Sequence, residues 1–114
     1  MAKSKGKDLF YIPGGKKEAG ETDIQALTRE TFEELGVSLI PSTAKEVFTL
    51  EAQAHGKPEG VMCRFLCISA DLVGEPFPSS EVEELRYLDT SQSNLTPEAG
   101  VLILQQLQKL DLID

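Results

Sequence analysis

The chain has 114 residues, 40% of them hydrophobic and 6% aromatic, which is typical of one modest globular domain. Its net charge of −8 disfavours binding to a nucleic-acid polymer, although metal ions could still shield a small phosphorylated substrate. No apolar run is long enough to span a membrane, and the basic start "MAKSKGKDLF" lacks the apolar core of a secretory signal. We therefore expect residues 1–114 to form a single cytoplasmic domain with no membrane partner.

The first half of the chain predicts a short strand, a glycine turn and a helix. Asp8 to Ile12 is an apolar run ended by the turn-forming "PGG" of residues 13–15, so we expect a strand there. The helix is predicted between two caps: Thr22, which can form a capping box with Gln25, and Gly36, which ends it. The preceding "MAKSKGK" shows no strand pattern, so we expect the sheet to be short at its N-terminal end.

The second half predicts three strands and a final helix, over residues 46–52, 61–70, 84–88 and about 97–110. Pro97 suits the first turn of that helix. Residues 61–70 are apolar at nearly every position, which is typical of a central strand covered on both faces of its sheet. Strands in this order with two helices indicate an α+β or layered α/β sandwich fold.

The only two cysteines, Cys63 and Cys67, lie in one predicted strand. Four residues apart in an extended chain, they are too distant to form a disulfide. Two reduced, buried thiols are favoured over a metal or redox role, and they suit a reducing compartment.

The predicted helix carries three glutamates within five residues, Glu30, Glu33 and Glu34. At about 100° per residue they fall opposite the face that holds the apolar side chains. A solvated acidic face is the simplest interpretation. However, like charges stack three and four residues apart, and two of them lie at the negative end of the helix dipole, with only Arg29 to compensate within the helix. A bound divalent cation would relieve this repulsion, and oxygen ligands favour Mg²⁺ or Mn²⁺.

A glycine-rich turn stands directly before this helix, and such turns let the backbone approach an ion or a phosphate. Together, residues 15–37, "GKKEAGETDIQALTRETFEELGV", resemble the signature of Nudix (MutT-like) hydrolases. That signature is Gly, any five, Glu, any seven, then Arg-Glu-U-x-Glu-Glu-x-Gly-U, where U is bulky and aliphatic. Every fixed position matches except Thr31, which replaces a U on the buried face and so affects packing rather than chemistry. The resemblance implies an α/β/α sandwich with a mixed sheet between helices.

The resemblance also implies an activity, the metal-dependent hydrolysis of a nucleoside diphosphate linked to another group. Metal ions neutralise the repelling charge of the phosphates so that water can attack at phosphorus. Glu33 and Glu34 are then the expected main ligands of Mg²⁺ or Mn²⁺, helped by the Gly15 carbonyl. Glu30 is a further ligand or the base that activates water, and Arg29 is expected to orient the glutamates.

Two more acidic residues take roles by resemblance. Glu21 would support the turn and the helix from outside the metal site. Many family members add an acid from a later loop ahead of an aromatic residue, and Glu81, before Tyr87, matches that pattern. Glu81 is therefore a candidate for the extra ligand or base, with a solvated loop carboxylate as the alternative.

Three basic residues are candidates for substrate binding. Arg64 interrupts an apolar strand, and a buried arginine needs a partner, either a substrate phosphate or a structural carboxylate. His55, the only histidine, lies in a polar loop, and Lys16 follows the glycine turn. Contact with solvent alone is the alternative for both.

The substrate class and the oligomeric state are less closely defined. Residues 53–55 carry neither the proline nor the tyrosine that mark two other family subgroups, which favours a nucleoside triphosphate, intact or oxidised, cleaved to a monophosphate and pyrophosphate. The short N-terminal end leaves a sheet edge that a second subunit could cover, so we expect a homodimer. The competing function is a non-catalytic module that binds a nucleotide or a protein partner. A calcium-binding domain is disfavoured because no EF-hand spacing is present.

Overall fold

The computed structural model describes residues 1–114, and its strands form three antiparallel pairs rather than one mixed sheet. The paired strands are β1 (Ala2–Ser4) with β6 (Val82–Leu85), β2 (Ser38–Leu39) with β5 (Leu72–Val73), and β3 (Lys45–Gln53) with β4 (Met62–Ser69). The helices are α1 (Asp23–Leu35), α2 (Glu98–Lys109) and the short 3₁₀ segments η1 (Pro41–Thr43) and η2 (Thr90–Leu95).

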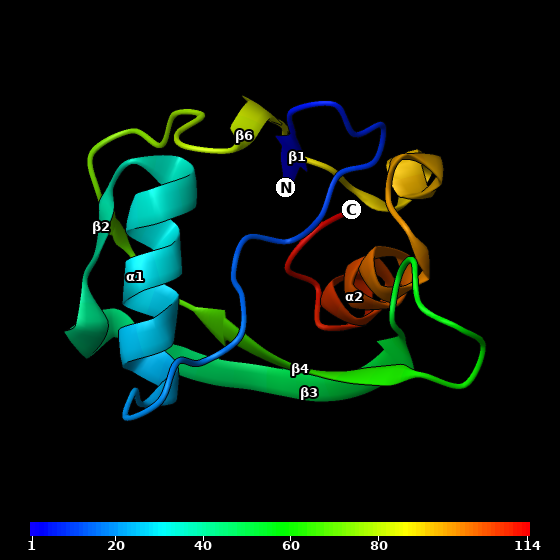
Figure 1. Ribbon diagram of the computed structural model, residues 1–114, viewed down its shortest axis with the longest axis horizontal. Coiled ribbons are helices and arrows are strands. Elements are labelled where there is room, and N and C mark those ends of the chain that lie inside the picture. Colours follow the sequence, from blue (N-terminus) through cyan, green and yellow to red (C-terminus); the bar gives the residue numbers. More distant parts are fainter.

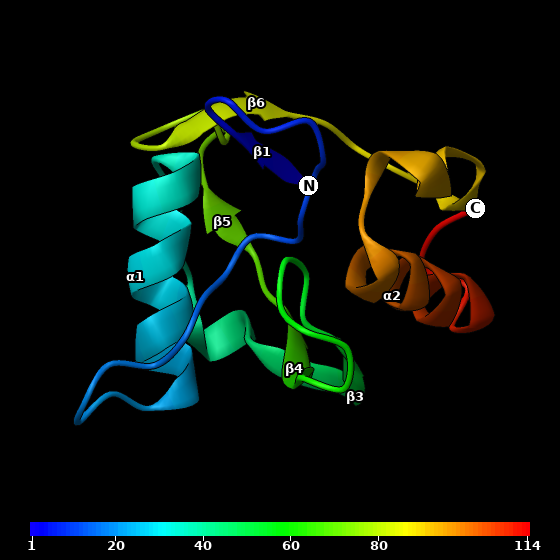
Figure 2. The same ribbon diagram turned by 45° about the vertical axis from the view of Figure 1, so that its right-hand side comes forward.

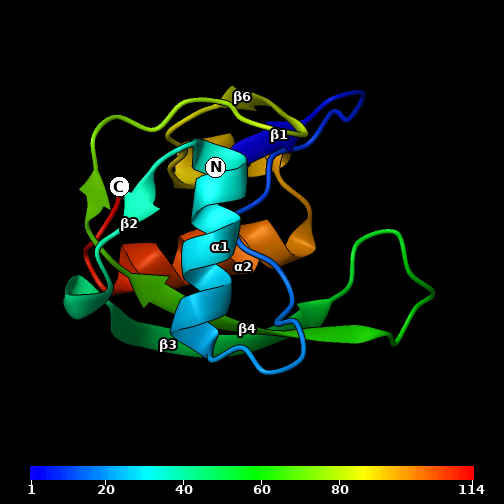
Figure 3. The ribbon, with the colours of Figure 1, turned by 60° about the vertical axis from the view of Figure 1, so that its left-hand side comes forward.

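The pairs and helices are arranged in layers that differ from the expected ones. The β1–β6 pair lies at one end of the molecule and the long β3–β4 ribbon at the other, with both helices between them (Figures 1 and 3). The α+β class is confirmed, but the helices lie between strand pairs instead of covering a central sheet. The segment that joins β1 to α1 runs between the two helices, which brings the glycine turn beside α1 (Figure 2).

The core forms where α2 packs on one face of β3. Ile103 and Leu104 of α2 are 1% and 2% exposed, and Ala52 of β3 is 1% exposed. The prediction that residues 61–70 form a central strand is wrong, because β4 pairs with β3 alone and only its Cys67 is buried, while Met62, Arg64 and Ser69 are exposed. Its apolar residues reflect one covered face and one open face, a difference that composition alone does not reveal.

The N-terminal segment also differs from expectation, because residues 2–4 form a strand and residues 8–12 do not. Ala2, fully buried at 0% exposure, exchanges two 2.8 Å backbone hydrogen bonds with Tyr11, the only strand-like pairing in residues 8–12. β1 is too short to show an alternating pattern, and its pairing with β6, some eighty residues away, is set by tertiary contacts. The strand expected at 84–88 is confirmed in part, at Val82–Leu85.

Helix α1 forms as predicted between its two caps. Thr22 accepts a hydrogen bond from the Gln25 amide at 3.1 Å while the Gln25 side chain accepts one from the Thr22 amide at 2.9 Å. Such a cap contributes about 1 kcal/mol. Gly36 ends the helix with φ 69°. Beyond it, the amides of Phe77 and Ser79 donate to the carbonyls of Leu35 and Glu34, which satisfies the last turn of α1.

The expectation of two buried, unpaired thiols holds for Cys67, whereas Cys63 is only partly buried. Cys63 and Cys67 are both unpaired, and burial raises the pKa of the Cys67 thiol to about 11. Neither helix has the length and apolar character needed to cross a membrane.

Candidate active site

The glycine turn packs directly on the glutamate side of α1. The Gly14 amide donates a 2.9 Å hydrogen bond to Oε1 of Glu34. A Cβ atom added to Gly15 would lie 2.6 Å from Oε1 of Glu30, closer than any side chain can come. A side chain at residue 15 would therefore displace the end of the Glu30 side chain, so glycine leaves room for the Glu30 carboxylate beside the turn.

Glu34 is buried, contrary to the expectation that all three glutamates face away from the apolar side of the helix. It is 8% exposed, because it follows Leu27 by seven residues, about two helical turns, and so shares its side of the helix. Burial raises the pKa of Glu34 to about 7, although the hydrogen bond from the Gly14 amide and the nearby Tyr11 hydroxyl lower it, and nearby Glu30 adds to the rise. Its second oxygen, Oε2, is buried without a hydrogen-bond partner.

Tyr11 is a contact of this site that sequence reasoning did not find. Its hydroxyl accepts a 3.3 Å hydrogen bond from the Ser4 hydroxyl and lies close enough to Glu34 and Glu30 for both carboxylates to act on it. Burial, with the nearby Glu34 carboxylate, raises the pKa of Tyr11. The only signal in the sequence was its place just before the "PGG" turn, within a segment we interpreted as a strand.

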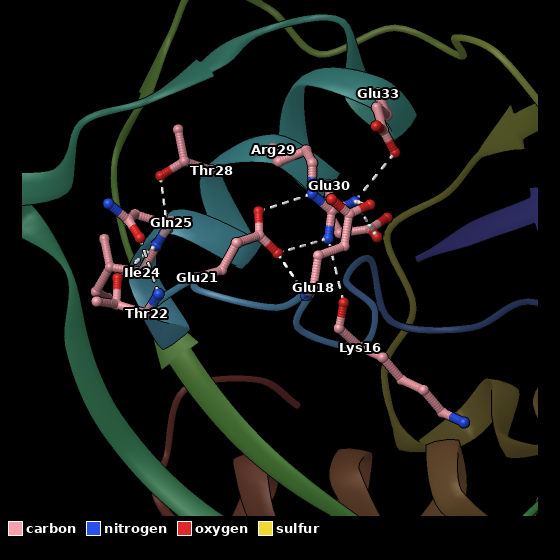
Figure 4. A network of polar contacts seen from close by, with 10 residues as sticks. All are labelled: Lys16, Glu18, Glu21, Thr22, Ile24, Gln25, Thr28, Arg29, Glu30 and Glu33. Atoms are coloured by element: carbon pink, nitrogen blue, oxygen red, sulfur yellow. Dashed lines mark hydrogen bonds and ion pairs between the residues drawn. The ribbon is translucent and has the colours of Figure 1, made fainter.

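Arg29 lies at the centre of a network of acidic side chains, as Figure 4 shows. Its guanidinium bonds Glu21 through two nitrogens, at 2.9 and 3.0 Å, and Glu30 at 2.8 Å. It also lies 3.7 Å from Glu18 and 3.6 Å from Glu33, and it donates to the Lys16 carbonyl at 3.1 Å. The bond to Arg29 is the main reason why the pKa of Glu21 is lowered.

The structure brings Glu30 and Glu34 together but leaves Glu33 apart. The Glu33 side chain is 51% exposed and turns toward Arg29 (Figure 4). No three His, Cys, Asp or Glu side chains converge in a way that would hold a metal ion. Holding a metal with all three glutamates would therefore require Glu33, and part of the Arg29–Glu30 pair, to move.

The four remaining predicted residues lie outside this group. The Glu81 side chain is exposed and makes no hydrogen bond or ion pair, while its carbonyl accepts from the Lys5 amide. Arg64 was expected to be buried but is exposed, opposite Glu51 in the β3–β4 register and without an ion pair, because it lies on the open face of the ribbon. The exposed Lys16 side chain points away from the acidic network (Figure 4).

His55 lies beside a second feature, a cavity of about 400 Å³. The cavity is lined by Lys7, Phe10, Tyr11 and His55, among others. Tyr11 thus lines this cavity and also lies near the carboxylates, whereas His55 makes no hydrogen bond or ion pair with Glu30 or Glu34. A larger cavity, between β3 and α2, contains none of the predicted site residues.

The α+β fold, with a glycine turn packed on a capped acidic helix, agrees with the Nudix signature in the sequence. Comparison with known proteins tests that resemblance. The model of the NUDIX domain matches residues 1–106, so the chain belongs to the Nudix family, and it is a pyrophosphohydrolase that acts on phosphoric anhydrides. It is also similar to the 8-oxo-dGTP diphosphatase of Haemophilus influenzae, with 38% identity over 100 residues that cover 84% of this chain and 68% of that protein.

Proposed function

We propose that this chain hydrolyses a nucleoside triphosphate, with oxidised purine nucleotides as the preferred class, to a nucleoside monophosphate and pyrophosphate. The preference is supported by the relative, whose name specifies 8-oxo-dGTP. We further propose that the reaction depends on Mg²⁺ or Mn²⁺, as is general among Nudix hydrolases. The two free thiols suit a reducing compartment such as the cytoplasm.

The observation that supports the proposal is that the Glu34 carboxylate is buried while one of its oxygens has no hydrogen-bond partner. A carboxylate oxygen buried without a partner is costly, so such groups are rare unless an ion or water completes them. Here the orphaned Oε2 belongs to a carboxylate held by the Gly14 amide, beside the Gly15 backbone and a second carboxylate, Glu30. Carboxylate and carbonyl oxygens are the donors that hard divalent cations prefer, so the residues present fit the expected metal.

Each residue then has a role that its position supports. Glu34 and Glu30, with Glu33 released from Arg29, would hold the metal beside the Gly15 carbonyl. When bound, the metal neutralises phosphate charge and lowers the pKa of water. Arg29 keeps its two-nitrogen bond to Glu21, which fixes the turn against the helix while its weaker contacts exchange. Glu30 would take the proton from the attacking water, and the alternative base, the exposed Glu81, would first have to move toward this group.

The test is a substrate panel measured with Mg²⁺ and with EDTA. It compares 8-oxo-dGTP, dGTP, ADP-ribose and a dinucleoside polyphosphate in wild type, Glu34→Gln and Glu46→Gln, a matched change at an exposed β3 residue. We expect Mg²⁺-dependent turnover, highest for 8-oxo-dGTP and reduced at least about 100-fold in Glu34→Gln, with Glu46→Gln unchanged.

The products identify the bond that is cleaved. Pyrophosphate release predicts that a phosphate assay responds only after inorganic pyrophosphatase is added. Direct phosphate release would contradict the proposed cleavage, and faster turnover of ADP-ribose would contradict the substrate class. Equal, negligible turnover in wild type and Glu34→Gln would favour a binding module instead.

A further inference from the structure

One nitrogen of the Arg29 guanidinium, Nη1, faces three carboxylates. It donates a 2.8 Å hydrogen bond to Oε1 of Glu30, and it lies 3.6 Å from Oε2 of Glu33 and 3.7 Å from Oε1 of Glu18 (Figure 4). The other two nitrogens, Nε and Nη2, both bond the carboxylate of Glu21. Nη1 is therefore the one nitrogen of the guanidinium for which several carboxylates compete.

Two of these three carboxylates, those of Glu30 and Glu33, belong to expected metal ligands. A carboxylate that shares its charge with a cation attracts a guanidinium less, and the two positive groups repel each other. The Arg29 side chain is only 24% exposed, so a nitrogen that loses its partners there is incompletely rehydrated, which is costly. Metal binding on α1 therefore requires another acceptor for Nη1.

Glu18 supplies the remaining carboxylate, and the turn before α1 holds it beside Nη1. The Glu18 amide donates a 2.7 Å hydrogen bond to Oε1 of Glu21, and the Glu18 carbonyl accepts one from the Glu21 amide at 3.1 Å. Because Glu21 also bonds Arg29 through two nitrogens, it fixes the Glu18 backbone relative to the guanidinium. The Glu18 side chain is 70% exposed and makes no hydrogen bond, so it can close the remaining distance to Nη1.

We propose that Glu18 is a positioning residue: it takes Nη1 of Arg29 when the metal ligands on α1 turn to the divalent cation. Glu18 touches neither the cation nor the substrate in this role. It lowers the cost of releasing the ligands from Arg29, while the bonds between Arg29 and Glu21 stay in place. The role rests on the proposed function, because it requires Glu30 and Glu33 to be metal ligands.

The experiment measures Mn²⁺ binding directly, from the electron paramagnetic resonance signal of free Mn²⁺, without substrate or turnover. The variants are Glu18→Gln, which removes the charge and keeps the shape, and Glu46→Gln, the same change at an exposed β3 residue. We expect Glu18→Gln to raise the Mn²⁺ dissociation constant about 2-fold to 5-fold, as for the loss of a partly exposed ion pair. Glu46→Gln leaves the constant at the wild-type value. A wild-type constant in Glu18→Gln overturns the proposal.

A second background separates this exchange from a plain effect of charge. Arg29→Lys keeps the positive charge but replaces the guanidinium fork by a single nitrogen, which cannot serve Glu21 and Glu18 as the fork does. The exchange predicts that adding Glu18→Gln to Arg29→Lys weakens Mn²⁺ binding less than it does in wild type. An equal loss in both backgrounds would mean that Glu18 acts only through its charge, which overturns the proposal. Circular dichroism checks that Arg29→Lys is folded, and Arg29→Gln is the second background, with the same expectation.

Glu34→Gln distinguishes a failure of the metal site from a failure of this role. It must abolish the same Mn²⁺ binding; if it does not, or if wild type binds no Mn²⁺, the proposed metal site is wrong and the exchange falls with it. If Glu34→Gln abolishes binding but Glu18→Gln binds Mn²⁺ as well as Glu46→Gln, only the role of Glu18 is overturned.

Discussion

Arg29 balances more negative charge than one cation can neutralise. It contacts four carboxylates, those of Glu18, Glu21, Glu30 and Glu33, at separations from 2.8 to 3.7 Å. The Glu34 carboxylate is left out of this network and accepts a hydrogen bond from the neutral Gly14 amide instead. The outer side of α1 and the adjoining turn therefore share one cation among four carboxylates, while the buried Glu34 lies outside this network.

This distribution predicts how the stability of the metal-free protein depends on pH. The pKa of Glu34 rises on folding from 4.5 to about 7, mainly because the carboxyl group is buried. A raised carboxyl pKa means that the folded state prefers the protonated form, so its contribution to stability is complete below pH 4.5 and is lost as the pH rises toward 7. In EDTA, we expect the free energy of unfolding of wild type to fall relative to that of Glu34→Gln across this window.

Urea unfolding at several pH values between 5 and 8 measures the effect. Because one proton is involved, the difference between the two proteins can change by no more than about 1.4 kcal/mol per pH unit. Glu46→Gln, the same change at an exposed residue, is expected to run parallel to wild type. Parallel curves for wild type and Glu34→Gln would show that Glu34 does not carry the buried charge.

At the scale of elements, Gly36 joins α1 to the loop that covers its end. The residue has φ 69°, and a Cβ atom there would overlap the Phe77 ring. Two separate costs of a side chain are thus expected: left-handed backbone strain of about 1–2 kcal/mol and overpacking of about 1–3 kcal/mol.

Gly36→Ala is therefore expected to lower the free energy of unfolding by about 2–5 kcal/mol, measured by urea denaturation. Gly56→Ala is the matched control, because Gly56 has a similar φ of 75° and nothing within 4 Å of the added atom. Gly56→Ala should lower the free energy of unfolding only by the backbone strain of about 1–2 kcal/mol. Equal losses in the two variants would mean that the Phe77 ring yields freely and that the contact does not fix the end of the helix.

The elements that could be predicted from the sequence are those whose ends are set by residues close to them in the chain. Helix α1 could be placed from Thr22 and Gly36 because caps act within a few residues of sequence. β1 could not, because its three residues acquire their conformation from β6 at the other end of the chain. The same distinction applies to the site: the motif predicts the residues along one helix, whereas Tyr11 reaches Glu34 only through the path of the chain between β1 and α1.

At the scale of the whole molecule, the strand pairs leave edges with which no other strand of the chain pairs. Each strand of the long ribbon has a single partner, so β3 and β4 both present one unpaired edge. Unpaired edges with apolar residues favour association, and Met62 of β4 is 54% exposed. The predicted homodimer would therefore use this ribbon.

Light scattering after size exclusion measures the solution mass, and we expect the mass of two chains of 12.5 kDa each. Met62→Lys places a charge beside the open edge and should shift the mass toward one chain, because like charges from two copies would then face each other. Leu112→Lys, at a residue 58% exposed in the C-terminal segment, adds the same charge away from the ribbon and should remain dimeric. One chain at every concentration would contradict the dimer, and an unchanged dimer in Met62→Lys would place its interface elsewhere.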